Sequence, residues 1–393
     1  MRVSLSVKAM RRLHLHPATY ALRRLAALAR HKLAGGPPVT RFLLLSDWLV
    51  GTSEQQFAPM ARHERELREQ LGIVFVRRHF HDIERDVVRG IAGFDVIGVK
   101  WSFQTAQPEV LEMLQRIRDA CRAAGARIVY FDGDDDLAVQ WSAVVGMVDL
   151  YVKKHAFADR AQYTRGFIGK SNLTEYSART FGVSFADDPI PCTQPVDTAF
   201  LDRLMVGWSI ALDDKIWDLQ RQLADFGTVT KDIDVCCRGL VPPSRWIHGM
   251  RLGAVEALEK LAGRYSVRPA RDRVSQEVYY REMLASRACL SPFGYGELCW
   301  RDFEAILCGA VLIKPSMEHV ATEPALFEPD VTYIPVEWDY SDLGEQCARY
   351  LGDPERMQRM ADEARRRLVE SHSSGWFVER VRVMMQALGT DSR

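Results

Sequence analysis

The residues best suited to chemistry lie in one stretch, where a predicted strand is followed by a glycine turn, a helix and a second strand. Gly294 and Gly296 form the turn, and the helix after it carries Glu297, Arg301 and Glu304 at intervals of four and three residues. Glycines allow the backbone to approach a ligand closely, and a helix start offers unpaired N–H groups and a positive dipole end. The stretch therefore predicts a site for an anion such as a diphosphate, with three charged side chains on one helix face. The alternative is a solvated face, on which Glu297 and Arg301 form an ordinary i,i+4 pair.

A second concentration of functional groups is the acidic run Asp132-Gly133-Asp134-Asp135-Asp136, which follows a predicted strand at 128–131. Carboxylates after a strand can hold a divalent ion or act as a general base. A calcium loop starting at Asp132 is excluded, because it would need Gly at 137 and Glu at 143, where Leu and Ala stand. A base, with Asp134 or Asp135 as the candidates, and a solvated acidic turn both remain open.

These groups are positioned by two blocks in which short apolar runs alternate with helical patterns, which is typical of βαβ units and parallel sheets. The first block predicts four strands, at 42–45, 73–76, 96–99 and 128–131, and a helix at 109–124. The second block predicts four strands, at 234–237, 265–267, 288–290 and 311–313. It also predicts three helices, at 249–262, 276–286 and 297–308. Two charged helices follow, at 353–370 and 376–388.

A proline-containing stretch at 187–195 separates the two blocks and excludes a central strand or helix there. We therefore expect a first Rossmann-like domain at 41–195 and a second at 196–370. Residues 371–393 would form a C-terminal helix that is a candidate to cross back to the first domain. Residues 1–40 form a separate N-terminal segment.

The composition is that of a soluble globular protein, with 393 residues and equal totals of 52 basic and 52 acidic side chains. Nothing in this balance favours nucleic acid as a partner. Residues 1–41, however, hold nine Lys or Arg and no Asp or Glu. This leader is too polar for a membrane span and lacks the apolar core of a secretory signal. It is either an amphipathic segment for an anionic membrane surface or a solvated terminus.

The eight cysteines contain no C-x-x-C pair and no spacing typical of a zinc site. Scattered single cysteines fit a reducing compartment, so we expect a cytoplasmic protein whose leader could contact the inner face of the cell membrane. No metal site is predicted.

The run Phe303–Ile313 resembles the E-A-x-A-C-G-x-P-V-I segment of group 1 glycosyltransferases, and Phe293-Gly294 matches the glycine turn before it. Residues 191–200 are similar to the P-N-G-V-D-x-x-x-F linker between the domains of those enzymes. The resemblance covers roughly residues 190–370, and exostosin-like sequences share an arginine and a shifted acidic residue in the helix. It implies an α/β fold of two Rossmann-like domains facing across a cleft, known as the GT-B type.

The resemblance also implies glycosyl transfer from a nucleotide-sugar donor to a hydroxyl acceptor, with no cofactor and no required metal. The acceptor expected is a glycan or glycolipid of a bacterial surface. By position, Glu304 would hydrogen-bond the ribose hydroxyls of the donor, which a carboxylate can do for two vicinal hydroxyls at once. Glu297 would contact the donor sugar or the acceptor. The sequence departs from the family here, because Gly296 stands where the first of two glutamates is usual and Glu297 comes one residue later.

The remaining site residues follow from the same comparison. Departure of a nucleoside diphosphate builds negative charge, which calls for a cation, with Arg238 first by position and Arg245 and Lys314 next. In addition to Arg238, the expected donor site therefore comprises seven residues, namely Gly294, Gly296, Glu297, Arg301, Glu304, Arg245 and Lys314. The expected acceptor side, besides the acidic run, comprises residues that follow the first two strands, namely Asp47, Trp48, Gly51 and His81.

Two other functions fit the same residues. A nucleotide-sugar epimerase of this fold would rearrange the donor without a separate acceptor. A binding or scaffold protein would keep the fold without turnover, and the displaced Glu297 favours that interpretation.

Overall fold

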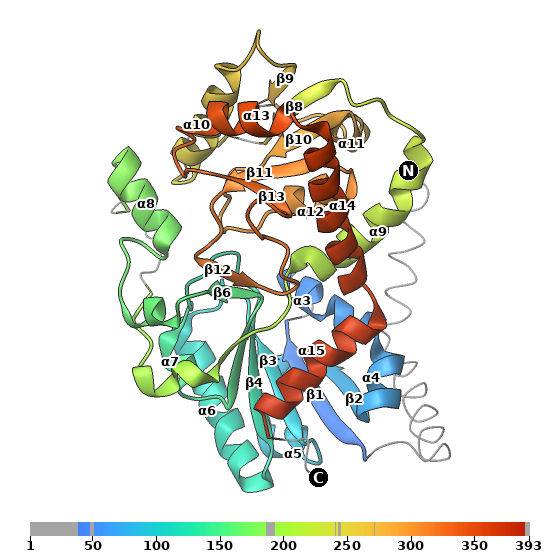
Figure 1. Cartoon of the computed structure of the whole chain (residues 1–393). Coiled ribbons are helices and arrows are strands. Elements are labelled where there is room, and N and C mark those ends of the chain that lie inside the picture. The colour runs from blue at the N-terminus through green and yellow to red at the C-terminus, as the bar shows by residue number, and fades with distance from the viewer. Residues whose placement is uncertain are drawn as a thin grey trace.

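The computed structural model of the chain describes residues 38–47, 51–185, 193–239, 241–242, 245–270 and 272–389. It contains two domains, each built on its own parallel sheet, which lie one above the other in Figure 1. Trp48 and most of the basic leader, residues 1–37, lie outside the described residues. The expectations for these residues stay predictions.

The first domain has a six-stranded parallel sheet in the order β2-β1-β3-β4-β5-β7. Its strands are β1 (Thr40–Ser46), β2 (Ile73–Arg78), β3 (Val96–Lys100), β4 (Arg127–Asp132), β5 (Leu150–Lys153) and β7 (Leu204–Val206). Apolar side chains on both faces of these strands are buried, as expected for a parallel sheet covered on both sides. The four strands predicted in this block are all present.

Helices of the first domain cover both faces of this sheet. They are α3 (Gly51–Arg62), α4 (Glu64–Leu71), α5 (Val87–Ile91), α6 (Gln107–Ala124) and α7 (Ser142–Val145). In α6 the apolar side chains at helical spacing, from Val110 to Cys121, are buried against the sheet. The helix ends at Gly125, whose φ of 70° is the left-handed conformation that glycine adopts without strain.

The second domain has a five-stranded parallel sheet in the order β13-β11-β10-β8-β9. Its strands are β8 (Ile233–Arg238), β9 (Val267–Ala270), β10 (Ser286–Leu290), β11 (Val311–Pro315) and β13 (Tyr333–Val336). Its helices are α9 (Asp214–Gln222), α10 (His248–Glu259), α11 (Gln276–Leu284), α12 (Trp300–Leu307), α13 (Leu343–Leu351) and α14 (Pro354–Ser371). Short 3-10 segments occupy Phe80–Asp82, Arg160–Thr164, Thr198–Arg203, Ile210–Leu212 and Leu223–Phe226.

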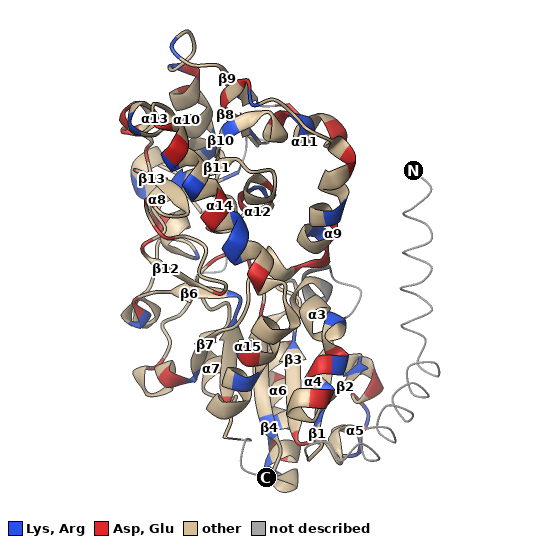
Figure 2. Cartoon of the chain, turned by 45° about the vertical axis from the view of Figure 1, so that its right-hand side comes forward, with Lys and Arg blue, Asp and Glu red and all other residues tan. Residues whose placement is uncertain are grey.

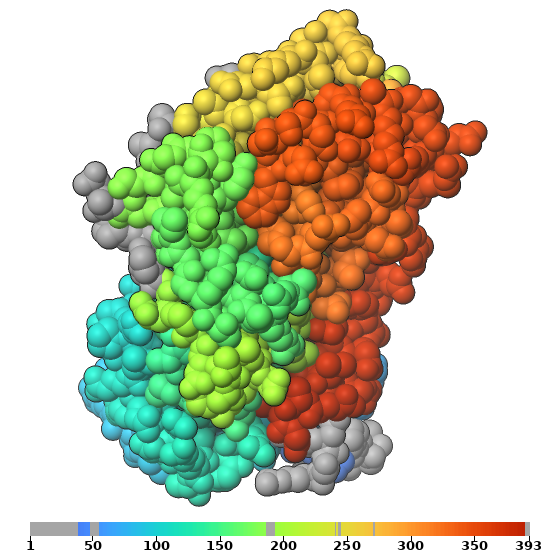
Figure 3. Space-filling view, turned by 60° about the vertical axis from the view of Figure 1, so that its left-hand side comes forward, coloured from blue at the N-terminus to red at the C-terminus, as the bar shows by residue number. Residues whose placement is uncertain are grey.

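Three elements connect the two domains. β6 (His155–Phe157) of the first domain pairs antiparallel with β12 (Val320–Thr322) of the second. α8 (Asn172–Phe181) precedes β7 in the chain but lies against the second domain, as the green segment beside the orange one in Figure 3 shows. α15 (Ser374–Ala387) returns to the first domain, where Phe377 and Val381 pack into its core.

The domain boundary differs from the one expected at 195. β7, at 204–206, pairs in parallel with β5 and completes the first sheet, so the first domain extends about ten residues further. The predicted helix at 297–308 also begins later, at Trp300, because Cys299 caps it. This difference removes Glu297 from the helix.

Charged side chains of both signs alternate over the helices on the side shown in Figure 2, notably on α4 and α14. In α14 they form i,i+3 and i,i+4 pairs such as Arg366 with Glu363 and Glu370. Within the described part of the chain, no helix is long and apolar enough to cross a membrane.

We expect Phe377→Ala to destabilise the protein by about 3–5 kcal/mol, the usual cost of removing a buried phenyl ring. The Phe377 ring is fully buried and lies 5.0 Å from the Trp208 ring and 5.4 Å from the His63 ring. Urea unfolding of the whole chain measures the change. Phe103→Ala is the control, because Phe103 is 50% exposed. An equal effect of both substitutions would contradict the role of α15 in holding the first domain.

Candidate functional site

The carboxyl ends of both sheets meet between the domains, which is where open parallel sheets bind ligands. The loop after β4, residues 133–136, touches the loop after β10, residues 291–299. The contact is so close that a Cβ atom on Gly296 would lie 1.5 Å from the carbonyl oxygen of Asp135. Glycine at 296 is therefore required by a neighbouring backbone of the other domain. The acidic run and the glycine turn are far apart along the chain, and the fold brings them into contact.

Asp132 anchors the acidic run in the first domain. Its carboxylate accepts hydrogen bonds from Lys153 Nζ at 2.7 Å and Tyr151 Oη at 2.8 Å, and all three side chains are buried. Burial alone would raise the pKa of Asp132, but the Lys153 ammonium outweighs it and lowers the pKa to about 2. Asp132 is therefore a fixed negative charge at neutral pH.

The other three carboxylates of the run share two lysines. Asp136 pairs with Lys170 at 2.8 Å, and Asp134 lies 3.9 Å from the same ammonium. Burial raises the pKa of Asp134, and the charge of Asp132 raises it further. Asp135 differs, because the ammonium of Lys154, 2.7 Å away, lowers its pKa. Of the two predicted base candidates, Asp134 is thus the one with the more basic carboxylate.

Lys100, at the end of β3, is a residue that the sequence analysis missed. Its side chain is fully buried, and a Cβ atom on Gly133 would lie 2.9 Å from its Nζ. Burial lowers the pKa of Lys100, against the attraction of Asp134 and Asp132. Lys100 therefore places a cation behind the acidic loop, facing the two carboxylates.

Glu297 crosses from the second domain to the first. Its fully buried carboxylate accepts a hydrogen bond from Asn172 Nδ2 at 2.9 Å and lies 3.8 Å from His155 Nε2 and 3.4 Å from His319 Nε2. Burial would raise the pKa of Glu297, but the two neighbouring imidazoles outweigh it and lower the pKa to about 2. Burial also lowers the pKa of His155, which favours the neutral imidazole.

At the start of α12, the sequence predicts N–H groups that face an anion, but a capping box already binds those of Cys299 and Asp302. Asp302, at the third helical position, accepts from Cys299 N at 2.9 Å, and Cys299 Sγ caps the turn in return. Gly294 N donates to Gly296 O at 3.0 Å. The turn does lie between the domains, where Gly296 contacts the backbone of Asp135, and the helix that follows is capped by its own residues.

Arg301 and Lys314 lie inside the second domain rather than in the space between the domains. Arg301 donates to the carbonyl oxygens of Arg238, at 2.6 Å, and Pro292, at 3.4 Å. Lys314 is fully buried and pairs with Asp302 at 3.0 Å. Arg301 thus fixes the loops after β8 and β10 to each other, whereas Lys314 neutralises Asp302 in the first turn of α12.

Glu304 lies on α12 as predicted, but protein groups already bind its carboxylate. Lys215 Nζ lies 2.7 Å from one carboxylate oxygen, and the hydroxyl groups of Tyr279 and Tyr280 donate at 2.8 and 3.2 Å. Lys215 is the accessible member of this set, since 41% of its side chain is exposed. A ribose that bound Glu304 would have to replace this ammonium or add to it.

The predicted cations after β8 differ in exposure. Arg238 is held in ion pairs with Glu282 and Asp272 on the far side of the loop. Arg245 is exposed, before α10. Arg251 on α10 lies beside the glycine turn, where its Nη2 would be 3.0 Å from a Cβ atom on Gly294. Arg251 therefore lies against the turn, and Arg245 is the exposed cation of the three.

The predicted acceptor side is assembled only in part. Asp47 lies 3.5 Å from His79, and the rings of His79 and His81 stack with centroids 4.5 Å apart. His81 points to solvent, with 80% of its side chain exposed, and contacts Glu84. Gly51 is the first residue of α3, and Trp48 is outside the described residues.

No three His, Cys, Asp or Glu side chains in the described ranges are placed to hold a metal ion together. The charged groups between the domains are instead paired with one another. Lysines at strand ends, the histidine of a short strand and Asn172 complete the site, and of these only the lysines carry a signal in the sequence, since they follow apolar runs.

We expect Gly296→Ala to separate the two loops, because the added methyl group would overlap the carbonyl of Asp135. Amide hydrogen exchange at residues 133–138 should become faster, and the melting temperature should fall. Gly253→Ala is the matched control, since its Cβ atom would make an ordinary contact with Tyr340 at 3.7 Å. Unchanged exchange in Gly296→Ala would show that the loops are not held together in solution.

Comparisons with known proteins agree with this architecture. Residues 243–382 match a family model described as glycosyl transferase-like, while no curated protein matches the chain by sequence. A crystal structure of a glycosyltransferase from Rickettsia africae ESF-5 has a TM-score of 0.50 at 10% identity, covering 90% of this chain and 99% of that one.

Two further structures are more distant. An alpha-glucosyltransferase in complex with UDP has a TM-score of 0.46 at 11% identity, over 88% of this chain and 99% of that one. A putative UDP-N-acetylglucosamine 2-epimerase from Listeria monocytogenes has a TM-score of 0.43 at 10% identity, over 90% and 98%. The family match confirms the resemblance seen in the sequence of the second domain, and the Rickettsia structure confirms the fold. The chain therefore has the two-domain GT-B fold, and its residues 243–382 are similar to the family described as glycosyl transferase-like.

Proposed function

We propose that the protein transfers a sugar from a nucleotide-sugar donor to a hydroxyl group of an acceptor. The observation that carries this proposal is the contact between the loops of Gly296 and Asp135, which brings ionisable groups of both domains together at the carboxyl ends of two parallel sheets. Such an arrangement can hold donor and acceptor from opposite sides and keep water out of the reaction. The glycosyl transferase-like domain supplies the reaction class.

Asp134 is the residue that we propose as the general base for an inverting reaction. Its raised pKa lets the carboxylate take the proton of an acceptor hydroxyl as the oxygen bonds to the sugar and the bond to the diphosphate breaks. Asp135 is a weaker base, because it is paired with Lys154. Lys170 lies close enough to stabilise the ionised form of Asp134 before the proton is taken.

The diphosphate that departs requires a cation. We propose Arg245 and Arg251 for this role, since the guanidinium of Arg251 lies at the glycine turn and Arg245 is exposed before the same helix. Arg238 keeps a positioning role through its carbonyl bond to Arg301. No metal or other cofactor is part of the proposal.

The proposal extends to the place of action. The acceptor is a glycan or glycolipid of a bacterial surface, and the protein works in the cytoplasm at the inner face of the membrane, to which its basic leader is attracted. The nine basic residues of that leader, without a single acidic one, support this part.

A scaffold without turnover is the second candidate, because Glu297 and Glu304 are both bound by protein groups. In that case the carboxylates would only hold the fold. Donor binding and transfer distinguish the two functions, as follows.

Glu304→Gln should weaken donor binding about tenfold, since a buried hydroxyl that loses its charged partner costs about 1–3 kcal/mol. Thermal unfolding with UDP, GDP, CMP and dTDP sugars measures the protection by each donor. Glu277→Gln, an exposed residue paired only with Arg281, is the control. A lower melting temperature of the free variant with full protection by the donor would assign Glu304 to the fold alone.

Asp134→Asn should lower the transfer rate by roughly 10²–10⁴, the range typical of a lost general base, and Asp135→Asn by much less. The base must be ionised, so kcat/KM should fall as the pH drops through the pKa of Asp134, which lies above the ordinary aspartate value. Product analysis with and without an added hydroxyl acceptor is the measurement. Donor rearrangement without an acceptor would instead identify an epimerase, and full activity of Asp134→Asn would exclude Asp134 as the base.

A further inference from the structure

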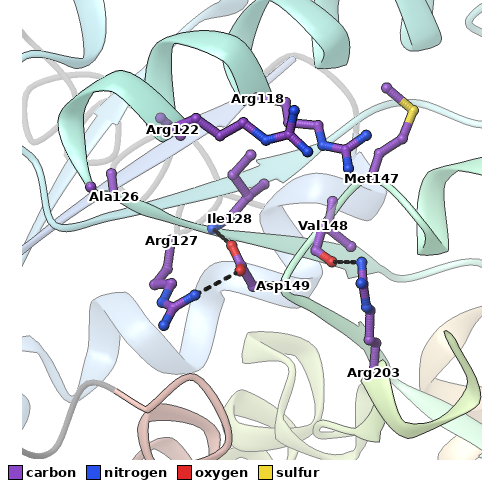
Figure 4. A pocket seen from close by; sticks show the side chains of 11 residues that line it. Arg118, Arg122, Ala126, Arg127, Ile128, Met147, Val148, Asp149 and Arg203 are labelled. Atoms are coloured by element: carbon purple, nitrogen blue, oxygen red, sulfur yellow. Dashed lines mark hydrogen bonds and ion pairs between the residues drawn. The ribbon is translucent and has the colours of Figure 1, made fainter.

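A pocket of about 460 Å³ opens on the first domain, away from the space between the domains. It is bounded by the last turns of α6, the start of β4 and the segment before β5, and Figure 4 shows it from close by. β4 runs from Arg127 at the pocket to Asp132 at the proposed active site, so the two sites lie roughly 17 Å apart on opposite edges of one sheet.

The pocket is strongly basic. Four arginines line it, Arg118, Arg122, Arg127 and Arg203, against a single carboxylate, Asp149. That carboxylate is already engaged, because one oxygen accepts from Arg127 at 3.1 Å and the other from Ile128 N at 2.7 Å. Asp149 therefore neutralises Arg127, and three positive charges remain around the pocket.

Arg203 is held in place without being neutralised. Its Nη1 donates to the carbonyl oxygens of Gly146 at 3.1 Å and Val148 at 2.7 Å, and its guanidinium lies 4.6 Å from the centre of the Phe200 ring. Carbonyl oxygens carry no net charge, so the arginine keeps its own. Among the described residues, no carboxylate oxygen lies within 4.0 Å of this guanidinium.

Arg118 and Arg122 lie one turn apart on α6 and extend over the same side of the pocket in Figure 4. Neither guanidinium lies within 4.0 Å of a carboxylate oxygen among the described residues. The negative end of the helix dipole favours a cation in the last turn, which explains the position of Arg122. Arg118 precedes that turn, so the dipole does not explain its position. Two like charges four residues apart destabilise a helix, so their position over a hollow needs another reason.

We propose that this pocket binds a phosphate-bearing ligand, held by Arg118, Arg122 and Arg203. Guanidinium groups bind phosphate oxygens through paired hydrogen bonds, and the three arginines come from two sides of the pocket. The volume is within the range of small-molecule sites and exceeds what a single phosphate fills. The ligand class is thus a phosphate ester, supplied either by a soluble metabolite or by a phospholipid head group. The site is independent of the proposed glycosyl transfer.

The test uses pyrophosphate as the probe and the methyl group of Met147, which lines the pocket, as the reporter. In the full-length protein labelled with [methyl-¹³C]methionine, the Met147 resonance, identified by its loss in Met147→Leu, should shift in a saturable way with pyrophosphate. Anion binding between the domains would leave this resonance unmoved, so the reporter separates the two sites.

Arg118→Gln/Arg122→Gln should weaken this binding at least tenfold while leaving the Met147 resonance of the free protein in place. Arg85→Gln/Arg89→Gln is the matched control, because both arginines are exposed in the same domain and neither lines the pocket. Its affinity should stay within twofold of the wild type. An unmoved Met147 resonance at millimolar pyrophosphate, or equal binding by both double variants, would overturn the proposal.

Vesicles identify the source of the phosphate. If the ligand is a lipid head group, wild-type protein should sediment with vesicles of phosphatidylcholine and phosphatidic acid at least threefold more than Arg118→Gln/Arg122→Gln does. Equal sedimentation together with the pyrophosphate shift would assign the pocket to a soluble phosphate ester. Both results support the site, whereas loss of the pyrophosphate shift contradicts it.

Discussion

The arrangement of the two domains depends on burying the carboxylate of Glu297 between them. A buried ion is costly unless its surroundings compensate it, and here Asn172 donates to one oxygen while the imidazoles of His155 and His319, from the two domains, lie 3.8 and 3.4 Å away. Next to it, Gly296 allows backbone contact with Asp135. One turn therefore defines the site, because the charge of Glu297 and the missing side chain of Gly296 are both needed at the same interface.

The sequence was sufficient for most of the fold because the strands of a parallel sheet are continuous apolar runs. β1, β3, β4 and β11 were predicted for this reason, and so was α6 from its spacing of apolar residues. β5 and β7 were not, since they are only four and three residues long and are recognised as strands by their pairing, β5 with β4 and β7 with β5. The boundary at 195 was wrong because β7 was not recognised as a strand. It follows the proline-containing stretch but belongs to the first sheet, where it pairs with β5.

The site was predicted as a set of residue types but not as a set of contacts. Glu297 and Arg301 were expected on one helix face, yet the helix begins at Trp300, so one side chain enters the other domain and the other side chain stays inside its own. Lys215 meets Glu304 from 89 residues away in the chain. Nothing local signals such a pair, because an isolated lysine after an apolar or loop segment is normally solvated.

The acidic run shows how neighbouring ion pairs can give identical side chains different chemistry. Asp132 is held ionised by Lys153 and Tyr151, so its charge does not vary near neutral pH. That fixed charge acts on Asp134, two residues away, and together with burial it raises the pKa there. Asp135 escapes this effect because Lys154 is its direct partner. A structural salt bridge in the core of the first domain thus helps to set the basicity of the carboxylate that we propose as the base.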